Sequence, residues 1–334
     1  MSNRFDYRTS KKYLQQNSFI SRYKSAIILF AKIAIAAGLL IYIIYSVNLQ
    51  EIVTAIKQAN VYLIAAAFLL SFVNIYLQFY KWKITANIVL QENHNSKIWL
   101  SMFYGFSAGV FTPARIGEYF GRALVFKNHS LLRVTIATLL DKFFPLLIVV
   151  FLGSISSILF IHYYYHIAYY LTIGLFITLF ILFYFFFLLI FNDRFWDNIL
   201  FAKLRNSVKL NWLFEKLKVF RNLDKKYATK MFVVSLLFYL CFLLQYSLLV
   251  SAFSNHNNFV DYFWAGNLMM FAKTIIPPVS LGELGIREGA SVFFIKQFGE
   301  AASTGFNASI FLFFINVLIP ALIGMILLLK KNDD

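Results

Sequence analysis

Residues 113–122 read PARIGEYFGR, and residues 278–287 read PVSLGELGIR. Both stretches follow one pattern: proline, any two residues, isoleucine or leucine, glycine, glutamate, any three residues and then arginine. The glutamate and the arginine are four residues apart, so they share one face of a helix and can pair. The repetition in register predicts an internal duplication, and duplicated broken helices are typical of transporters.

The composition is typical of a membrane protein. Of the 334 residues, 60% are hydrophobic and only 14% are charged, whereas soluble domains carry about 25% charged residues. The formal charge of +16 first suggests a nucleic-acid partner. We exclude nucleic acid because the basic residues lie between the apolar runs, as the positive-inside rule predicts.

Six apolar runs are long enough to cross a bilayer, which takes about 20 helical residues. They are residues 25–47, 61–80, 131–160, 167–191, 231–253 and 304–329. Residues 48–60 are predicted to form a short polar loop, and Lys81, Trp82 and Lys83 are interpreted as an anchor at the membrane interface after the second run. Two shorter runs, 98–112 and 262–276, each stop at a proline and are followed by an amphipathic stretch. Such short pieces predict re-entrant helical hairpins. The predicted fold class is therefore all-α, a polytopic membrane protein with six full transmembrane helices and two re-entrant hairpins.

Three full spans separate the two hairpins, so the hairpins are expected to start from opposite sides of the membrane, in an inverted repeat. Repeat one covers about 61–160 and repeat two about 231–329. Residues 1–24 form a basic tail, 25–330 the transmembrane domain, and 192–230 a basic loop with an amphipathic surface helix. If both termini are cytoplasmic, every basic loop falls inside. This predicts a multi-pass protein of the cytoplasmic membrane.

Charged residues gather at the two repeated stretches and in the span after the first. Charges inside a bilayer persist where they are paired or line a wet path. One interpretation is a set of helix-locking ion pairs. We favour the other, a single midplane cavity in which arginine and lysine bind a lipid phosphate. The predicted headgroup ligands are Arg115, Arg122, Arg287 and Lys142, and the predicted charge-balancing or proton-exchanging groups are Glu118, Glu283, Asp141 and Glu288.

Prolines and glycines define the helix breaks. Proline interrupts a helix and glycine allows close approach, so four residues are predicted to shape the hairpins: Pro113, Gly117, Pro278 and Gly282. The spacings of Gly105 and Gly109, and of Gly117 and Gly121, also favour tight helix contact. Glu288 directly follows Arg287, so the two are predicted to point to different faces. We predict no cofactor and no metal, since His162 and His166 have no further ligand beside them.

The repeated stretches, together with the Asp141-Lys142 pair, resemble the membrane domain of the lysylphosphatidylglycerol synthase/flippase family. A first family motif, of proline, a basic residue, an apolar residue, glycine and glutamate, is similar to the stretch from Pro113 to Glu118, with Arg122 a turn later. A second is similar to residues 284–288, which read LGIRE. The likeness covers roughly residues 25–330. It implies lipid handling without naming the lipid.

The resemblance favours a lipid translocase that is not an enzyme. The chain stops soon after its last span, so we expect it to lack the family's soluble aminoacyltransferase domain. The expected cargo is an anionic phospholipid, an aminoacyl-lipid or a polyprenyl-phosphate-linked lipid. Two alternatives stay open: a membrane-embedded lipid-modifying transferase, and a docking partner for a soluble glycosyl- or aminoacyltransferase at loop 192–230. Membrane lipids are the expected partners, and a homo-oligomer is also considered.

Overall fold

The structure is a computed structural model that describes residues 41, 45, 49–110, 112, 115–191, 225–276 and 284–331. This part of the chain is all-helical and contains no strand. Within it, five helices are long and apolar enough to span a membrane: Val61–Leu90, Leu131–Tyr165, Tyr169–Phe186, Lys225–Ser254 and Ala302–Lys330. They match five of the six predicted spans. The predicted span 25–47 and the predicted surface helix of loop 192–230 lie outside the described residues, apart from a few positions.

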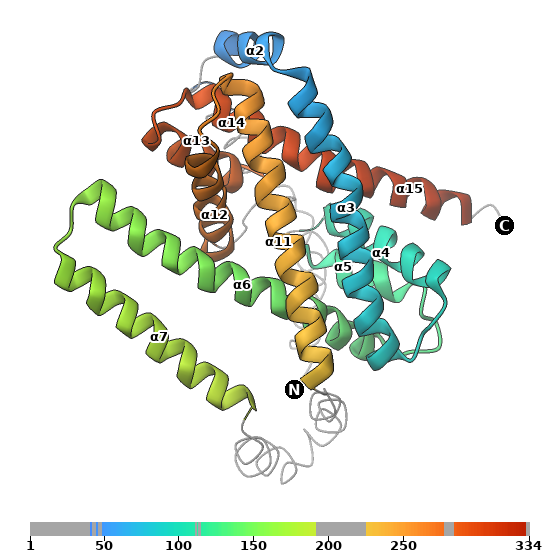
Figure 1. Ribbon diagram of the computed structural model, residues 1–334. Helices are drawn as coiled ribbons and strands as arrows, with labels where there is room; N and C mark the ends of the chain where they lie inside the picture. The colour runs from blue at the N-terminus through green and yellow to red at the C-terminus, as the bar shows by residue number, and fades with distance from the viewer. Residues whose placement is uncertain are drawn as a thin grey trace, which may run out of the picture.

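The order long helix, short helix, short helix, long helix occurs twice (Figure 1). The first set is α3 (Val61–Thr85) continued by the π-helical segment η1 (Ala86–Leu90), α4 (Asn95–Val110), α5 (Gly117–Ala123) and α6 (Leu131–Tyr165). The second set is α11 (Lys225–Ser254), α12 (Phe259–Ile275), α13 (Ile286–Gln297), and α14 (Ala302–Phe313), which η3 (Phe314–Leu318) and α15 (Ile319–Lys331) extend. Helix α7 (Tyr169–Phe191) lies between the sets.

Helices α3 and α11 form the centre of the bundle and pack along each other. The short helices α4 and α5 pack together, and α4 also packs against α15 of the second set. In the same way α12 packs against α13 and against α6 of the first set. Each pair of short helices therefore contacts a long helix of the other set. Helix α7 packs along α6, on the outer side of the bundle (Figure 1).

Local sequence explains where several helices begin. The Asn60 side chain accepts hydrogen bonds from the amides of Tyr62 and Leu63 at the start of α3, and Ser130 accepts one from Arg133 at the start of α6. Side-chain oxygens at this position satisfy the free amides of a first turn. Helix α13 starts after Gly285, whose φ of +93° suits glycine because a side chain would be strained there.

The glycine spacings predicted to favour tight contact do so between α4 and α5. A Cβ atom on Gly117 would overlap the backbone carbonyl of Ala108, and one on Gly121 would overlap that of Tyr104. A Cβ atom on Gly105 would meet the side chain of Arg122. The two short helices thus approach until the backbone of one touches the other, which only glycine permits.

Two predicted boundaries are wrong. Residues 48–60, predicted as a polar loop, contain the helix α2 (Leu49–Gln58), which buries Ile52 against Phe306 and exposes its other apolar side chains. Polar and apolar residues are interspersed in this segment, so the helical period of its apolar residues was not recognised. The second error concerns residues 225–230, predicted as the end of the basic loop. They form the first turns of α11 instead.

The turn between η1 and α4 is held by Glu92. Its carboxylate accepts hydrogen bonds from the amide of His94 at 3.0 Å and from Lys97 Nζ at 3.1 Å, and it also contacts the His94 ring. Burial acts to raise the pKa of Glu92, but these hydrogen bonds outweigh it and lower the pKa from 4.5 to about 2. Glu92 therefore stays ionised at any physiological pH.

Candidate functional site

Six charged side chains meet between α3, α5 and α6. They are Lys81, Arg115, Glu118, Arg122, Asp141 and Lys142, and we call them the charge cluster. Four are cations and two are carboxylates, so the cluster keeps two positive charges in excess. Lys81, Asp141 and Lys142 lie within helices long enough to span a membrane. The cost of such charges in hydrocarbon is lowered only by pairing or by water.

Asp141 holds two cations at once. Its Oδ1 atom lies 2.6 Å from Lys81 Nζ, and its Oδ2 atom lies 3.0 Å from Arg122 Nη1. The three side chains are 2–7% exposed, so these pairs are shielded from water and from screening by salt. Through Asp141, helix α6 is tied both to α3 and to α5.

A proline explains why Lys81 is held so firmly. Pro145 lies inside α6 and has no N–H, so the carbonyl of the residue four positions earlier, Asp141, lacks its helical partner. Lys81 Nζ donates to that carbonyl at 2.7 Å in addition to the Asp141 carboxylate. One ammonium group thus satisfies a backbone acceptor that the helix itself leaves open.

Glu118 is the second centre of the cluster. Its Oε1 atom lies 2.7 Å from Arg122 Nη2, so the ion pair predicted from the i, i+4 spacing is present. Its Oε2 atom lies 2.6 Å from Lys142 Nζ and 3.5 Å from Arg115 Nη2. The exposed fraction of the side chain is 34% for Lys142 and 21% for Arg115, but only 4–5% for Glu118 and Arg122. The cluster is therefore accessible from the side of Lys142 and Arg115.

Arg115 is the most loosely held cation of the cluster. Its ion pair is the longest of the five, and its Nε atom is buried without a hydrogen-bond partner. Its backbone φ is +54°, a left-handed conformation that costs free energy for a residue with a side chain. The Nε atom of Arg122 is also buried without a hydrogen-bond partner, so the longer ion pair and the strained backbone are what distinguish Arg115 within the cluster.

Aromatic side chains hold the arginines from the other side. The Arg122 guanidinium lies over the Trp82 ring, 4.1 Å from its centroid, and the Trp82 Nε1 atom donates to Ser101 Oγ on α4. Trp82 is fully buried. Because a guanidinium is attracted by the face of an indole ring, Trp82 fixes the orientation of Arg122.

The second repeated stretch forms a separate buried site. Arg287 pairs with Glu288 and donates from Nε to Ser309 Oγ at 3.0 Å, and it lies over the Phe313 ring. Glu288 Oε2 also accepts from the amide of Gly285 at 2.6 Å and so caps its own helix. The prediction that Arg287 and Glu288 point to different faces is wrong, because the flexible side chains converge at the helix start.

The predicted residues are thus divided between two sites. Among the described residues, no hydrogen bond or ion pair joins the charge cluster to the Arg287–Glu288 pair.

Of the residues predicted to shape the helix breaks, Gly117 begins α5, and its amide donates to Thr112 Oγ1 at 2.7 Å. Four predicted residues lie outside the described residues: Pro113, Pro278, Gly282 and Glu283. The pairing of Glu283 with Arg287 therefore stays a prediction.

Asp141 and Lys142 were predicted as a pair, but each binds a residue of another helix. Sequence reasoning also missed Lys81, which with Trp82 and Lys83 was interpreted as an anchor at the membrane interface. Lys81 and Trp82 are instead buried, whereas Lys83 is partly exposed. The signal that could have found Lys81 is the proline four residues after Asp141, which requires an external donor at that level of α6.

The fold and the charge cluster define a multi-pass membrane protein with a buried site of excess positive charge. The chain matches the family described as lysylphosphatidylglycerol synthase TM region over residues 29–324, and it belongs to that family. The match covers all three helices that build the cluster. No curated protein matches the chain significantly.

Proposed function

We propose that the protein moves an anionic lipid between the leaflets of the cytoplasmic membrane. The observation that carries this proposal is the excess of two positive charges in a buried cluster of which only Arg115 and Lys142 are accessible. A phosphodiester or phosphate would supply the missing negative charge. The name of the family, which refers to a lysylphosphatidylglycerol synthase, supports a lipid as the ligand.

In this proposal the lipid phosphate binds Arg115 and Lys142 in competition with Glu118. Glu118 Oε2 holds both cations while the site is empty, at 3.5 Å and 2.6 Å. Guanidinium and ammonium groups form strong, charge-assisted bonds to phosphate oxygens. Arg122, Asp141 and Lys81 are more buried. In this proposal they stay paired with one another, do not contact the lipid and keep the net charge of the site positive. The candidate cargoes are an anionic phospholipid, an aminoacyl-lipid and a polyprenyl-phosphate-linked lipid.

We further propose that the two helix sets are an inverted repeat with two re-entrant hairpins, α4–α5 and α12–α13. Two observations support it: the same order of helices in both sets, and the reciprocal packing of each short pair on a long helix of the other set. With the basic ends inside, both termini would be cytoplasmic.

This topology can be tested by chemical labelling. In a Cys241→Ser background, a membrane-impermeant maleimide should label Lys127→Cys only after the inner face of the membrane is opened. It should label Asn257→Cys in intact cells. Both positions are exposed in the structure. Labelling of both from the same side would exclude the inverted repeat.

Translocation can be tested in proteoliposomes that contain fluorescent phosphatidylglycerol or phosphatidylcholine, with an impermeant reductant that quenches the outer leaflet. The double variant Arg115→Gln/Lys142→Gln should move the anionic lipid at least about tenfold more slowly, since both accessible ligands are lost. The control Lys57→Gln/Lys296→Gln removes the same charge from exposed positions and should match the wild type. Equal rates for the two double variants would remove the proposed site.

A further inference from the structure

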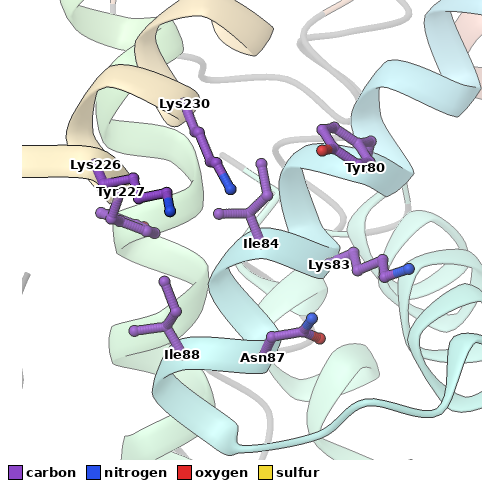
Figure 2. A pocket seen from close by; sticks show the side chains of 8 residues that line it. All are labelled: Tyr80, Lys83, Ile84, Asn87, Ile88, Lys226, Tyr227 and Lys230. Carbon is purple, nitrogen blue, oxygen red and sulfur yellow. The ribbon is translucent and has the colours of Figure 1, made fainter. Parts of the chain in front are cut away.

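A second polar cavity lies where α3 ends and α11 begins (Figure 2). Its volume is about 530 Å³, which is within the range of roughly 300–1,000 Å³ found for small-ligand sites. Three lysines, two tyrosines, an asparagine and two isoleucines line it, and none of the described residues that line it is acidic. None of these residues belongs to the charge cluster.

Within the described part of the chain, the lysines of this cavity have no acidic partner. Lys226 and Lys230 are one turn apart on α11, and their side chains extend towards Ile84 on α3 (Figure 2). Lys83 lies on the α3 side and adds a third positive charge. Among the described residues, no carboxylate forms an ion pair with any of these three lysines. The cavity therefore attracts an anion, and no side chain that lines it supplies one.

The same cavity offers apolar contacts on one side. Ile84 and Ile88 line it, and Tyr80 stands at its edge. From Tyr80 an exposed apolar strip continues along α3 through Tyr76 and Val73, which are 56% and 48% exposed and follow at helical spacing. A free phosphate would leave this apolar strip unused, whereas a ligand with a phosphate and hydrocarbon chains would fill both parts.

One wall of the cavity is shared with the turn of α3 that leads to the charge cluster. Tyr227 is buried, and its hydroxyl lies 3.1 Å from Thr85 Oγ1. Thr85 in turn donates to the carbonyl of Lys81. The cavity and the charge cluster are thus neighbouring but separate sites on one helix.

We propose that this cavity binds the phosphate group of an anionic phospholipid. Lys226 and Lys230 contact the phosphate oxygens, and the acyl chains lie on Ile84, Ile88 and the exposed strip of α3. Basic pockets between transmembrane helices are a known means of holding acidic lipid headgroups. The inference does not rest on translocation, because a lipid can be held here whether or not the protein moves it.

Lipid binding can be measured by native mass spectrometry of the full chain, titrated in detergent with phosphatidylglycerol or phosphatidylcholine. The wild type should retain phosphatidylglycerol in preference to phosphatidylcholine. The variant Lys226→Gln/Lys230→Gln should bind phosphatidylglycerol on the order of tenfold more weakly, from the loss of two lysines near a phosphate. The variant Lys226→Arg/Lys230→Arg should retain it. The matched control Lys127→Gln/Lys330→Gln, which removes two exposed lysines elsewhere, should also bind normally.

Two further measurements identify the part of the ligand that the cavity recognises. Ile84→Asp, which places a carboxylate opposite the lysines, should abolish the preference for phosphatidylglycerol while the protein still elutes as a folded species. Inorganic phosphate should not displace the lipid at comparable concentration. Unchanged binding by the glutamine variant, equal retention of the zwitterionic lipid, or displacement by inorganic phosphate alone would each overturn the proposal.

Discussion

Replacing Asp141 by asparagine should destabilise the protein strongly. The carboxylate holds Lys81 through one oxygen and Arg122 through the other, at 2.6 Å and 3.0 Å. Asparagine keeps the size of the side chain and one acceptor oxygen, but it turns an amide NH₂ group towards the second cation. One buried cation therefore loses its ion pair with residue 141, although Arg122 keeps Glu118 and Lys81 keeps the Asp141 carbonyl.

The magnitude follows from the burial of the cations. Removing one partner of a buried ion pair costs about 3–5 kcal/mol, because the remaining charge is left without compensation. Lys81 keeps the Asp141 carbonyl at 2.7 Å in the variant, and asparagine still accepts one hydrogen bond. We therefore expect Asp141→Asn to lower the free energy of unfolding by about 3 kcal/mol, the lower end of that range.

A double-mutant cycle with Lys81→Met separates the pairing from other effects. Lys81→Met alone leaves the Asp141 carbonyl without a donor and the carboxylate with Arg122 only. In the Asp141→Asn background the same change removes a cation that has already lost its carboxylate, so it should cost about 2 kcal/mol less than in the wild type. The stability lost in the Lys81→Met variant is not fully recovered in the double variant, because the Asp141 backbone carbonyl still lacks a hydrogen-bond donor.

The free energy of unfolding can be measured in mixed detergent micelles, by titration with a denaturing detergent and tryptophan fluorescence. Lys142→Gln is the comparison within the cluster, and it should cost no more than about 1 kcal/mol because its side chain is 34% exposed. The reasoning is refuted if Asp141→Asn is as stable as the wild type, or if the two substitutions of the cycle are additive.

Three further predictions concern other parts of the molecule, and the first of them compares two glycine substitutions. Gly117→Ala should lower the free energy of unfolding by about 1–3 kcal/mol, because its Cβ overlaps the α4 backbone. Gly174→Ala in α7, where a Cβ meets nothing within 4 Å, should be neutral or stabilising. Glu288→Gln should destabilise by about 3 kcal/mol, since Arg287 is buried and loses its carboxylate. Because the folded-state pKa of Glu92 is lowered to about 2, its stabilisation is complete above the unfolded pKa and is lost as pH falls through about 2.

The same micellar unfolding assay checks all three. Equal effects of the two glycine substitutions would show that α4 and α5 are not in backbone contact. A Glu288→Gln variant with wild-type stability would contradict the assignment of Glu288 as the carboxylate that balances the buried Arg287. For Glu92, the stability difference between wild type and Glu92→Gln should narrow as pH falls below about 4.5. A constant difference would contradict the lowered pKa.

Much of the helical organisation was predictable because it depends on period and length. The apolar runs predicted the five spans that the described residues contain, the short runs predicted the short helices α4 and α12, and the i, i+4 spacing predicted the pair of Glu118 and Arg122. These signals are local, and each depends on residues within a few turns of one another.

The composition of the site was less predictable because it depends on contacts across helices. Lys81 was interpreted as an interfacial residue, since nothing near it in sequence shows that it reaches a carbonyl and a carboxylate sixty residues later. For the same reason Asp141 and Lys142 were predicted to act together, although Asp141 binds Lys81 and Arg122 whereas Lys142 binds Glu118. Glu288 was misplaced because adjacent long side chains can converge even when their Cβ atoms diverge.

The missing N–H of Pro145 links the choice of residue at two distant positions. A lysine ammonium can donate to the carbonyl and the carboxylate of Asp141 at once, whereas the planar fork of arginine would be too wide for both. With any residue other than proline at position 145, α6 could close its own hydrogen bond, and only the carboxylate of Asp141 would still require Lys81. Proteins engineered from this chain should therefore treat positions 81, 141 and 145 as one unit.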